Sequence, residues 1–474
     1  MAFNRRAVLG FLGAMLWPLR VLGQDRASPV SKPNEPASTA GGTSTSSADG
    51  FTVLEAKRGT IRLVSTPARE TEVWGYDGQV PGPLLRLKKG AELKVRLVNR
   101  LDQPVTVSWQ GVRGPNAMDG VAGLTQAPVK PGESFEARFT PRDSGIFWYH
   151  SHVWPHTAEQ VARGLYGVLI VDELEPPPAD EEALLVVDDW SLDAQSQIEG
   201  GFGDVEQAGQ GGRIGPLVTV NSSPAPRVSK MRPGSRVRVR LLNACHARIL
   251  TLTFAGAHPQ VQAIDGQPCE IFEPVRQTLP LGPGARFDVM LDLPSETGKE
   301  VRLVSRREGE PDQPLLVVTT EGAPRKPREP VAGLPANPAL PAAIPLERAL
   351  KMDVVIDGGI KAGPDPAKLW TINGVASDGF SGKPLFKVKR GDAVSLAFVN
   401  KSAFPQQMQV RGHALRLLHD LDDGWEPYWR DAVLVAPGRT KHVAFVADNP
   451  GKWAIESLFL ERQVTGLAAW FEVT

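Results

Sequence analysis

The stretch "PLLRLKKGAELKVRLVN" (residues 83–99) returns twice along the chain, as "PRVSKMRPGSRVRVRLLN" (226–243) and as "PLFKVKRGDAVSLAFVN" (384–400). In each copy a turn glycine precedes a run of alternating apolar and polar residues. The run ends at an asparagine nine residues after the glycine. Alternation with a period of two predicts β-strands that bury one face. Three copies, about 150 residues apart, predict an all-β fold of three tandem β-sandwich domains.

Two proline-rich stretches separate the copies. The shorter one, "DELEPPPADEE", follows the first copy, and the longer one, over 321–345, follows the second. Proline-rich segments are extended and semi-rigid, which suits them to connect domains. The predicted domains span 51–173, 183–320 and 351–474, with a proline-rich linker over 321–350.

The N-terminus has the pattern of an export signal. Arg5 and Arg6 precede a short apolar run, and small residues before position 24 offer a cleavage site. Residues 1–23 are therefore predicted to be a twin-arginine-type signal peptide, with an ordinary basic-then-apolar signal as the alternative. Residues 24–50 contain few core-forming residues and are predicted to be a disordered linker. Either signal predicts a periplasmic protein without a stable membrane span after signal removal.

The charge balance limits the partners. The 474-residue chain has 53 Lys plus Arg and 53 Asp plus Glu. A balanced charge produces no overall field that would attract nucleic acid. We therefore expect no nucleic-acid partner.

The chain has two cysteines, Cys245 and Cys269. The residues between them are predicted to form a strand, a turn at "AGAHP" and a returning strand, which would bring the two ends of the hairpin together. Export permits a disulfide, and we predict one between these residues. Two separate buried thiols are the alternative.

The segment "GIFWYHSHVWPH" (145–156) places His150 and His152 two residues apart in a chain of 8 histidines. Alternate residues of a strand share a face, and imidazole suits copper, zinc, iron and nickel. The pair is either a set of metal ligands or a set of retained packing groups. His156 is a third potential ligand, although Pro155 interrupts the strand before it.

Three tandem domains with "GIFWYHSH" closing the first resemble the multicopper oxidases, which include laccases and bacterial copper oxidases. The segments "DGQVPGPLLRLKKG", "AMDGVAGLTQAPVKPG" and "ADNPGKW" extend the resemblance over about residues 51–474. It implies three cupredoxin-like Greek-key β-sandwich domains. It also implies four histidine motifs that hold one blue copper and a three-copper cluster, which reduces dioxygen.

Most of the implied copper ligands are substituted in this chain, and only His150 and His152 of the second motif remain. The substituted positions are Ser108 and Gln110 in the first motif, Gln406, Gln409 and Arg411 in the third, and Glu456, Ser457, Leu458, Arg462 and the axial Leu467 in the fourth. A serine hydroxyl stays protonated near neutral pH and a guanidinium cannot coordinate a metal. We therefore predict no cofactor, no catalytic residues and no oxidase activity, with copper at low occupancy on the two histidines as the alternative.

The chain is also similar to the copper-free cell-division proteins of SufI type, through "WYHSHVWPHTAEQVARGLYGVLIVDE". It departs from them because "HSH" survives and because "DGVAGLTQAPV" resembles the oxidases. Three functions stay open: a non-catalytic periplasmic scaffold that binds a protein partner, a weak copper or zinc binder, and a residual laccase-type oxidase.

Two of the substitutions carry opposite charges. Arg411 and Glu456 replace histidines that project into one cavity in the family, and an unpaired buried charge is costly. We predict that they form an ion pair beside His150 or His152, with Gln110 or Gln409 completing the hydrogen bonds. The alternative is that both side chains turn out to solvent.

Overall fold

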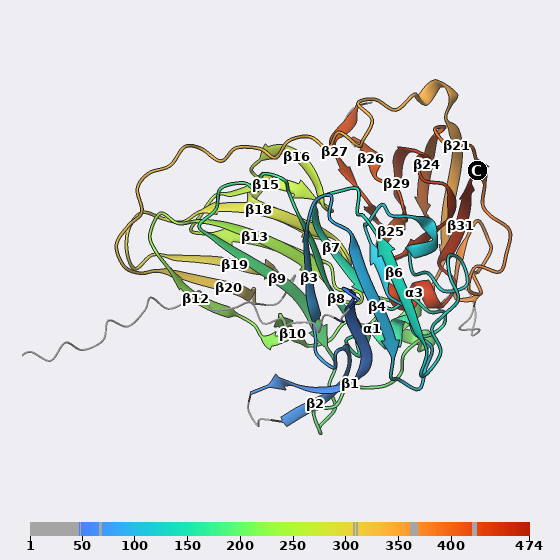
Figure 1. Cartoon of the computed structure of the whole chain (residues 1–474), viewed down its shortest axis with the longest axis horizontal. Coiled ribbons are helices and arrows are strands. Elements are labelled where there is room, and N and C mark those ends of the chain that lie inside the picture. The colour runs from blue at the N-terminus through green and yellow to red at the C-terminus, as the bar shows by residue number, and fades with distance from the viewer. Residues whose placement is uncertain are drawn as a thin grey trace, which may run out of the picture. The chain divides into compact units, whose positions relative to one another are not determined.

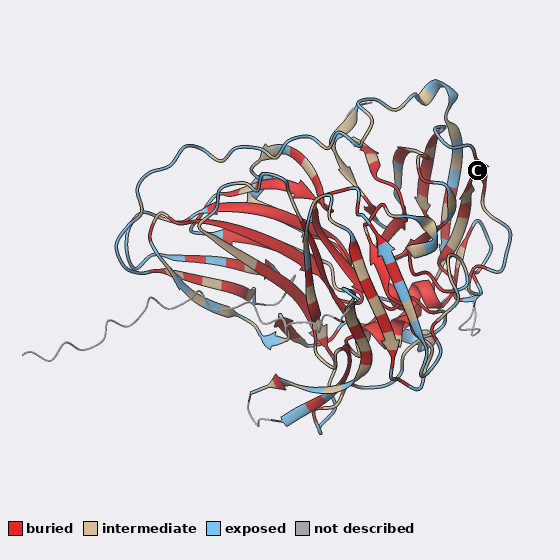
Figure 2. Cartoon of the chain, in the orientation of Figure 1, coloured by how far each residue is buried: buried red, intermediate tan, exposed pale blue. Residues whose placement is uncertain are grey.

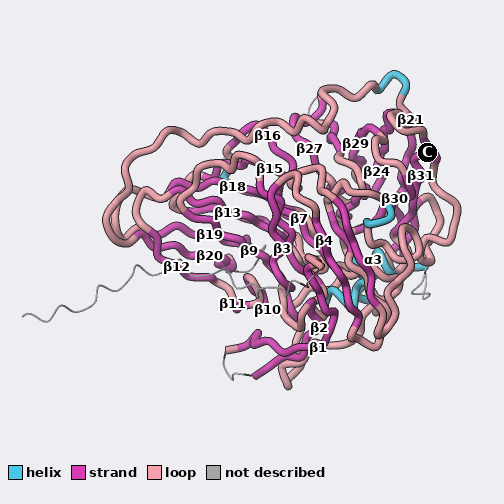
Figure 3. Tube along the Cα trace, in the orientation of Figure 1, coloured by secondary structure: helices cyan, strands magenta, loops and turns pink. Residues whose placement is uncertain are grey.

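The computed structural model describes residue 47 and residues 49–65, 69–306, 309, 311–360, 368–419 and 424–474. The predicted signal peptide and most of the predicted 24–50 linker lie outside these residues. Within them, no helix combines the length and the apolar character that crossing a membrane would require. The described residues form six β-sheets and only a few short helices, so the all-β prediction is confirmed (Figures 1 and 3).

The first sandwich consists of two four-stranded sheets, with strand orders β2-β1-β4-β6 and β3-β8-β7-β5. Its strands are β1 (Thr52–Val64), β2 (Arg69–Tyr76), β3 (Gly82–Lys88), β4 (Leu93–Asn99), β5 (Ser108–Gln110), β6 (Ser134–Phe139), β7 (Gly145–His150) and β8 (Tyr166–Asp172). Its helices are η1 (Asn116–Met118) and α1 (Thr157–Ala162).

The second sandwich pairs a seven-stranded sheet, β11-β10-β9-β13-β18-β15-β16, with a five-stranded sheet, β12-β20-β19-β14-β17. Its strands are β9 (Glu181–Trp190), β10 (Leu217–Val220), β11 (Ser223–Pro224), β12 (Arg227–Met231), β13 (Arg236–Asn243), β14 (Leu250–Ala255), β15 (Pro259–Ile264), β16 (Gln267–Phe272), β17 (Thr278–Leu281), β18 (Arg286–Asp292), β19 (Glu300–Arg306) and β20 (Gln313–Thr320). Its helices are α2 (Val205–Gly209) and η2 (Val275–Gln277).

The third sandwich pairs a six-stranded sheet, β22-β21-β24-β29-β26-β27, with a five-stranded sheet, β23-β31-β30-β25-β28. Its strands are β21 (Leu350–Gly358), β22 (Trp370–Ile372), β23 (Lys387–Val388), β24 (Ala393–Asn400), β25 (Gln406–Val410), β26 (Leu415–Leu418), β27 (Trp425–Arg430), β28 (Ala432–Val435), β29 (Thr440–Val446), β30 (Gly451–Ser457) and β31 (Ala468–Val473). Its helices are η3 (Leu346–Arg348) and α3 (Leu460–Val464).

The repeated sequence forms the same strand in each sandwich. The repeat strands β4, β13 and β24 each lie between a parallel partner (β1, β9, β21) and an antiparallel partner (β6, β18, β29). The opposite sheet of a sandwich covers one face of these strands. The residues of β4 accordingly alternate between buried and half-buried, whereas β13 is buried along its whole length (Figure 2).

The terminal asparagine of each repeat makes the same three hydrogen bonds. Its Oδ1 accepts from the backbone N–H two residues later, and its Nδ2 donates to one nearby carbonyl and to one distant carbonyl. The distant acceptors are Val129 for Asn99, Leu281 for Asn243 and Val435 for Asn400. All three asparagines are buried. A side chain that satisfies buried carbonyls in this way explains why each repeat ends at asparagine rather than at an apolar residue.

Each sandwich has its own apolar core, and a further cluster joins all three. This cluster includes Trp148 and Ile170 of the first sandwich, Val186 of the second, and Leu460 and Val464 of the third. The three sandwiches therefore share buried contacts in addition to their covalent connections.

The predicted disulfide is wrong: Cys245 and Cys269 are both free thiols. The hairpin assumed between them does not exist, because β14 belongs to the five-stranded sheet and β15 to the seven-stranded sheet. The "AGAHP" turn therefore carries the chain across the sandwich. The Sγ of Cys245 lies 3.7 Å from the Val187 carbonyl oxygen, and that of Cys269 lies 3.9 Å from the Val261 carbonyl oxygen.

Candidate functional site

Strands of the first and third sandwiches present most of the positions at which copper ligands were expected. Ser108 on β5 is paired with His150 at the end of β7. Gln409 on β25 is paired with Glu456 on β30. These four residues are buried, so their polar atoms depend on protein partners.

His150 is a buried neutral imidazole. Its Nδ1 lies 2.8 Å from the Ser151 carbonyl oxygen, and its Nε2 has no hydrogen-bond partner within the described part of the chain. Its ring packs against Trp148, with 4.5 Å between centroids. Burial, followed by the electrostatic effects of His152 and Arg411, lowers the pKa of His150 to about 3.

His152 binds Glu456 of the third sandwich. Its Nε2 lies 2.8 Å from the Oε2 of Glu456, and the Nε2 of Gln463 on α3 lies 3.3 Å from the same oxygen. Burial alone would raise the pKa of Glu456, but His152 and then Arg411 outweigh it and lower the pKa to about 2. Glu456 is therefore ionised at neutral pH.

Arg411 lies between two carboxylates. Its Nη1 is 3.6 Å from the Oε1 of Glu456, and its Nε and Nη2 donate to the Oδ2 and Oδ1 of Asp119 at 2.9 and 3.1 Å. The Nη2 also donates to the Oγ of Ser108. The predicted ion pair of Arg411 and Glu456 beside His152 is thus confirmed, and the alternative of two solvent-facing side chains is excluded.

The prediction that Gln110 or Gln409 completes the hydrogen bonds of this group is wrong. Gln110 donates to the Gly284 carbonyl oxygen at 3.4 Å, and the side-chain atoms of Gln409 have no hydrogen-bond partner among the described residues. Asp119 and Gln463 take their place. Asp119 stands in the quoted segment "AMDGVAGLTQAPVKPG", and the sharing of Glu456 between Arg411 and His152 was the signal for a second carboxylate beside the arginine.

Arg462 occupies the position at which a blue-copper histidine was expected. It is fully buried and donates to the Oε1 of Gln406 at 2.9 Å and to the Gln210 carbonyl oxygen at 2.8 Å. Three aromatic rings surround its guanidinium, at 4.3 to 5.5 Å from their centroids: Trp370, Phe404 and Phe459. No carboxylate of a described residue lies within ion-pair distance of it. Burial lowers the pKa of Arg462 to about 9, so the group still carries its charge at neutral pH.

The donor set at this position does not fit a blue copper. Such a centre requires a thiolate and two imidazoles, whereas this chain offers a hydroxyl, a carboxamide, a guanidinium and an apolar side chain. The Oγ of Ser457 already accepts from the Phe459 N–H at 3.1 Å, and Leu467 is buried. The fixed charge of Arg462 would also repel a cation.

The neighbouring cluster position fits copper only in part. The buried Nε2 of His150 has no partner in the described part of the chain, which suits a retained ligand, but Arg411 and Glu456 are engaged with each other and with Asp119 and His152. His156, the third potential ligand, immediately precedes α1. Among the described residues, neither His150 nor His152 belongs to a group of three potential ligand atoms within 4.8 Å of one another.

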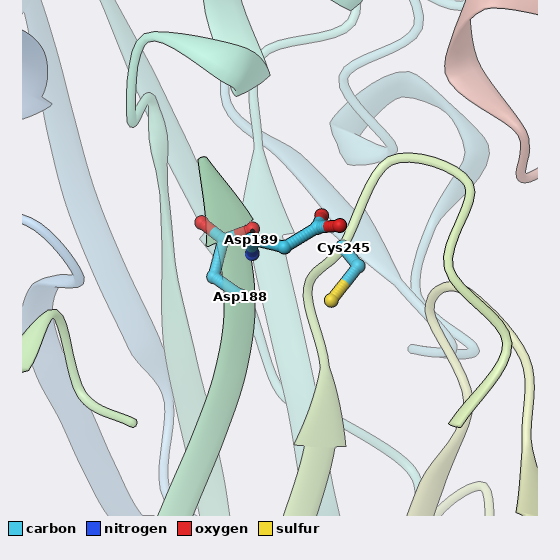
Figure 4. Close-up of side chains that lie close together, drawn as sticks. All are labelled: Asp188, Asp189 and Cys245. Carbon is cyan, nitrogen blue, oxygen red and sulfur yellow. Dashed lines mark hydrogen bonds between the residues drawn. The ribbon is translucent and has the colours of Figure 1, made fainter. Parts of the chain in front are cut away.

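The described residues contain one such group, formed by Asp188 and Asp189 at the end of β9 and by Cys245 in the loop after β13 (Figure 4). Protein partners already occupy it. Asp188 accepts from the Tyr166 hydroxyl at 2.6 Å, and Asp189 accepts from the Nε of Arg248 at 2.9 Å. Burial raises the pKa of all three groups, which opposes the deprotonation that metal binding needs. We assign the group a structural role.

The chain matches known proteins over most of its length. The family description "Multicopper oxidase" matches residues 59–176 and again residues 351–474. A multicopper oxidase of Mycobacterium tuberculosis is 28% identical, with 98% of this chain and 96% of the relative aligned. A multi-copper oxidase structure from Pseudomonas thermotolerans is 32% identical, with a TM-score of 0.80 over 89% of this chain and 98% of that one. One from Pseudomonas parafulva is 30% identical, with a TM-score of 0.79 over 89% and 100%.

These matches overturn the prediction of no cofactor. The relatives are multicopper oxidases, which bind copper, so copper is the metal that family membership implies for this chain. The prediction rested on single substituted motifs, whereas the resemblance extends over whole domains. By its two family matches and by structural neighbours of 30% identity or more over their whole length, the chain belongs to the multicopper oxidase family.

Proposed function

We propose that this member of the family does not perform the four-copper oxidation of laccases and works instead as a non-catalytic periplasmic scaffold that binds a protein partner. The observation that carries the proposal is Arg462. In the family's reaction electrons from the substrate enter at the blue copper, and here a buried guanidinium bonded to Gln406 and to the Gln210 carbonyl takes that place. The residues of this chain give those electrons no acceptor at that position.

The periplasmic part of the proposal rests on the sequence. The twin arginines, Arg5 and Arg6, and the apolar run after them support export by the twin-arginine pathway. Replacement of both arginines by lysine should retain the protein in the cytoplasm. An ordinary export signal would tolerate that change.

Copper or zinc binding at His150 and His152 is the second candidate function. It is favoured by the buried Nε2 of His150, which has no partner among the described residues, and by the copper of the family. Such a site would bind one ion and would not oxidise substrates.

Both candidates can be tested on one preparation. The protein is purified from periplasm of cells grown with excess copper, and its metal content, its visible spectrum and its oxygen consumption with a phenolic substrate are measured. The Pseudomonas thermotolerans oxidase serves as the positive control. We expect no intense visible band and no oxygen consumption. Activity or such a band would overturn the proposal, and one bound copper that disappears in His150→Asn would establish the second candidate.

The scaffold role has its own test. Protein in a periplasmic extract should elute from a size-exclusion column at a larger size than the purified chain, because a partner is bound. Elution at the size of the purified chain would contradict this role.

A further inference from the structure

The polar residues at the former ligand positions bond mainly to other sandwiches. Five of the ten substituted positions take part in a hydrogen bond or ion pair that crosses between sandwiches: Ser108, Gln110, Arg411, Glu456 and Arg462. We infer that these positions now provide inter-sandwich bonds that hold the three sandwiches together as one rigid body. The inference deepens the proposed scaffold role and rests on it.

The strongest set of inter-sandwich bonds joins the first and third sandwiches. It is a chain of buried polar contacts, in which Asp119 of the first sandwich binds Arg411 of the third, Arg411 contacts Glu456, and Glu456 binds His152 of the first. All four side chains are at least 96% buried. Charged groups out of water depend on their partners, so separation of the two sandwiches would strand charge on both sides.

The second sandwich is tied to the third by two neighbouring residues of α3. Arg462 donates to the Gln210 carbonyl at 2.8 Å, and Glu461 accepts from the Gly203 N–H at 2.6 Å. Both acceptor and donor belong to the segment around α2, between β9 and β10. Among the substituted positions, Gln110 adds a longer bond to Gly284 between the first and second sandwiches, which other residues such as Tyr166 and Asp188 also join.

The remaining substituted positions show why the pattern is not a trivial result of burial. Gln406 bonds to Ser402 and Arg462, and Ser457 to Phe459, all within the third sandwich. Leu458 and Leu467 are apolar and buried. Burial alone therefore does not decide which positions cross. Leu458 lies beside Gly284 of the second sandwich but, being apolar, makes no hydrogen bond to it.

The test compares the buried Arg411 with the partly buried Arg248, each of which forms an ion pair with an aspartate whose side chain is buried. Arg411→Met removes the inter-sandwich bonds of Arg411, whereas Arg248→Met removes the ion pair with Asp189, which lies within the second sandwich. The full-length periplasmic protein is followed by calorimetry and by the rate of proteolysis in the 321–345 linker. Wild type should unfold in one transition. Arg411→Met should lower its midpoint by about 10 °C, split the transition into two and speed linker cleavage.

Arg248→Met should lower the midpoint but keep a single transition and the wild-type cleavage rate. Glu456→Gln, which keeps the shape of the side chain, replaces Arg411→Met if that variant does not fold. A single transition with unchanged linker cleavage in both Arg411→Met and Glu456→Gln would overturn the inference. Neither readout depends on oxidation, so a chain that proved to be an active oxidase would refute the proposed function and leave this result interpretable.

Discussion

Two positions at which copper ligands were expected accommodate a buried arginine in opposite ways. Burial alone would lower the pKa of Arg411, but Asp119 and then Glu456 raise it above its ordinary value. Arg462 has no carboxylate partner among the described residues, and burial lowers its pKa to about 9. Arg411 is held by opposite charge, and Arg462 is held by carbonyl oxygens and aromatic rings. The difference teaches that a buried arginine can be accommodated either by opposite charges or by carbonyl dipoles and the faces of aromatic rings.

The largest expected effect comes from removal of the charge balance at Arg411. Asp119→Asn keeps the shape of the side chain but leaves Arg411 with only the more distant Glu456, at 3.6 Å. Stranding a buried charge typically costs about 3–5 kcal/mol, and we expect a loss of about 3 kcal/mol in the free energy of unfolding, measured by urea denaturation. Asp102→Asn, at an exposed pair with Arg58, is the control and should change stability little. Equal stability of the two variants would contradict the role assigned to Asp119.

Glu456→Gln should have the next largest effect. It removes the negative charge that binds His152 at 2.8 Å and contacts Arg411, while Asp119 still compensates the guanidinium. We expect a loss of about 2 kcal/mol, within the range for hydrogen bonds to charged groups. In the double variant Asp119→Asn with Glu456→Gln, the loss in the free energy of unfolding should exceed the sum of the losses in the two single variants. The reason is that Arg411 then has neither Asp119 nor Glu456 as an ionised partner. Simple additivity would show that the two carboxylates do not share Arg411.

The neutral His150 should appear in the pH dependence of stability. Burial lowers its pKa from 6.5 to about 3, so between these values the unfolded chain binds a proton at this residue and the folded chain does not. Stability then falls as the pH falls through this window, by about 1.4 kcal/mol per pH unit from this group. When the pH is lowered from 6 to 5, the free energy of unfolding of His150→Asn should therefore fall by about 1.4 kcal/mol less than that of wild type. Parallel curves for wild type and His150→Asn would contradict the neutral state.

Arg462→Met should have the smallest effect. The methionine loses the hydrogen bonds to Gln406 and to the Gln210 carbonyl, which costs stability. It also removes a buried charge without a carboxylate partner, which is favourable. We expect the two terms to nearly cancel and leave a loss of about 1 kcal/mol in urea denaturation. A loss as large as that of Asp119→Asn would remove the distinction between the two positions.

Sequence patterns predicted the repeats well because each repeat strand is specified locally. The alternating run, the turn glycine and the terminal asparagine all lie within about ten residues, and each has a local physical cause. The ion pair of Arg411 and Glu456 was also predictable, because two opposite charges at positions that share one cavity must compensate each other.

The wrong predictions depend on information that the alternation of apolar and polar residues does not contain. A strand pair with a short turn looks the same whether it forms a hairpin or crosses to the other sheet, so the Cys245–Cys269 disulfide was predicted where β14 and β15 lie in different sheets. Asp119 was missed because it lies in a loop at the end of η1, far in sequence from Arg411. The absence of a cofactor was predicted from motifs alone, and the family matches over whole domains contradict it.

The asparagines that end the three repeats, Asn99, Asn243 and Asn400, have a consequence for the chemical ageing of the protein. Deamidation would convert each into aspartate, which replaces an N–H donor by an acceptor and adds a negative charge. At Asn99 that charge would face the carbonyl oxygens of Gln103 and Val129, which the amide now satisfies. The next residues along the chain are Arg100, Ala244 and Lys401 rather than glycine, and their side chains hinder the backbone attack that starts deamidation. The positions where the reaction would do most harm are thus also positions where it is slow.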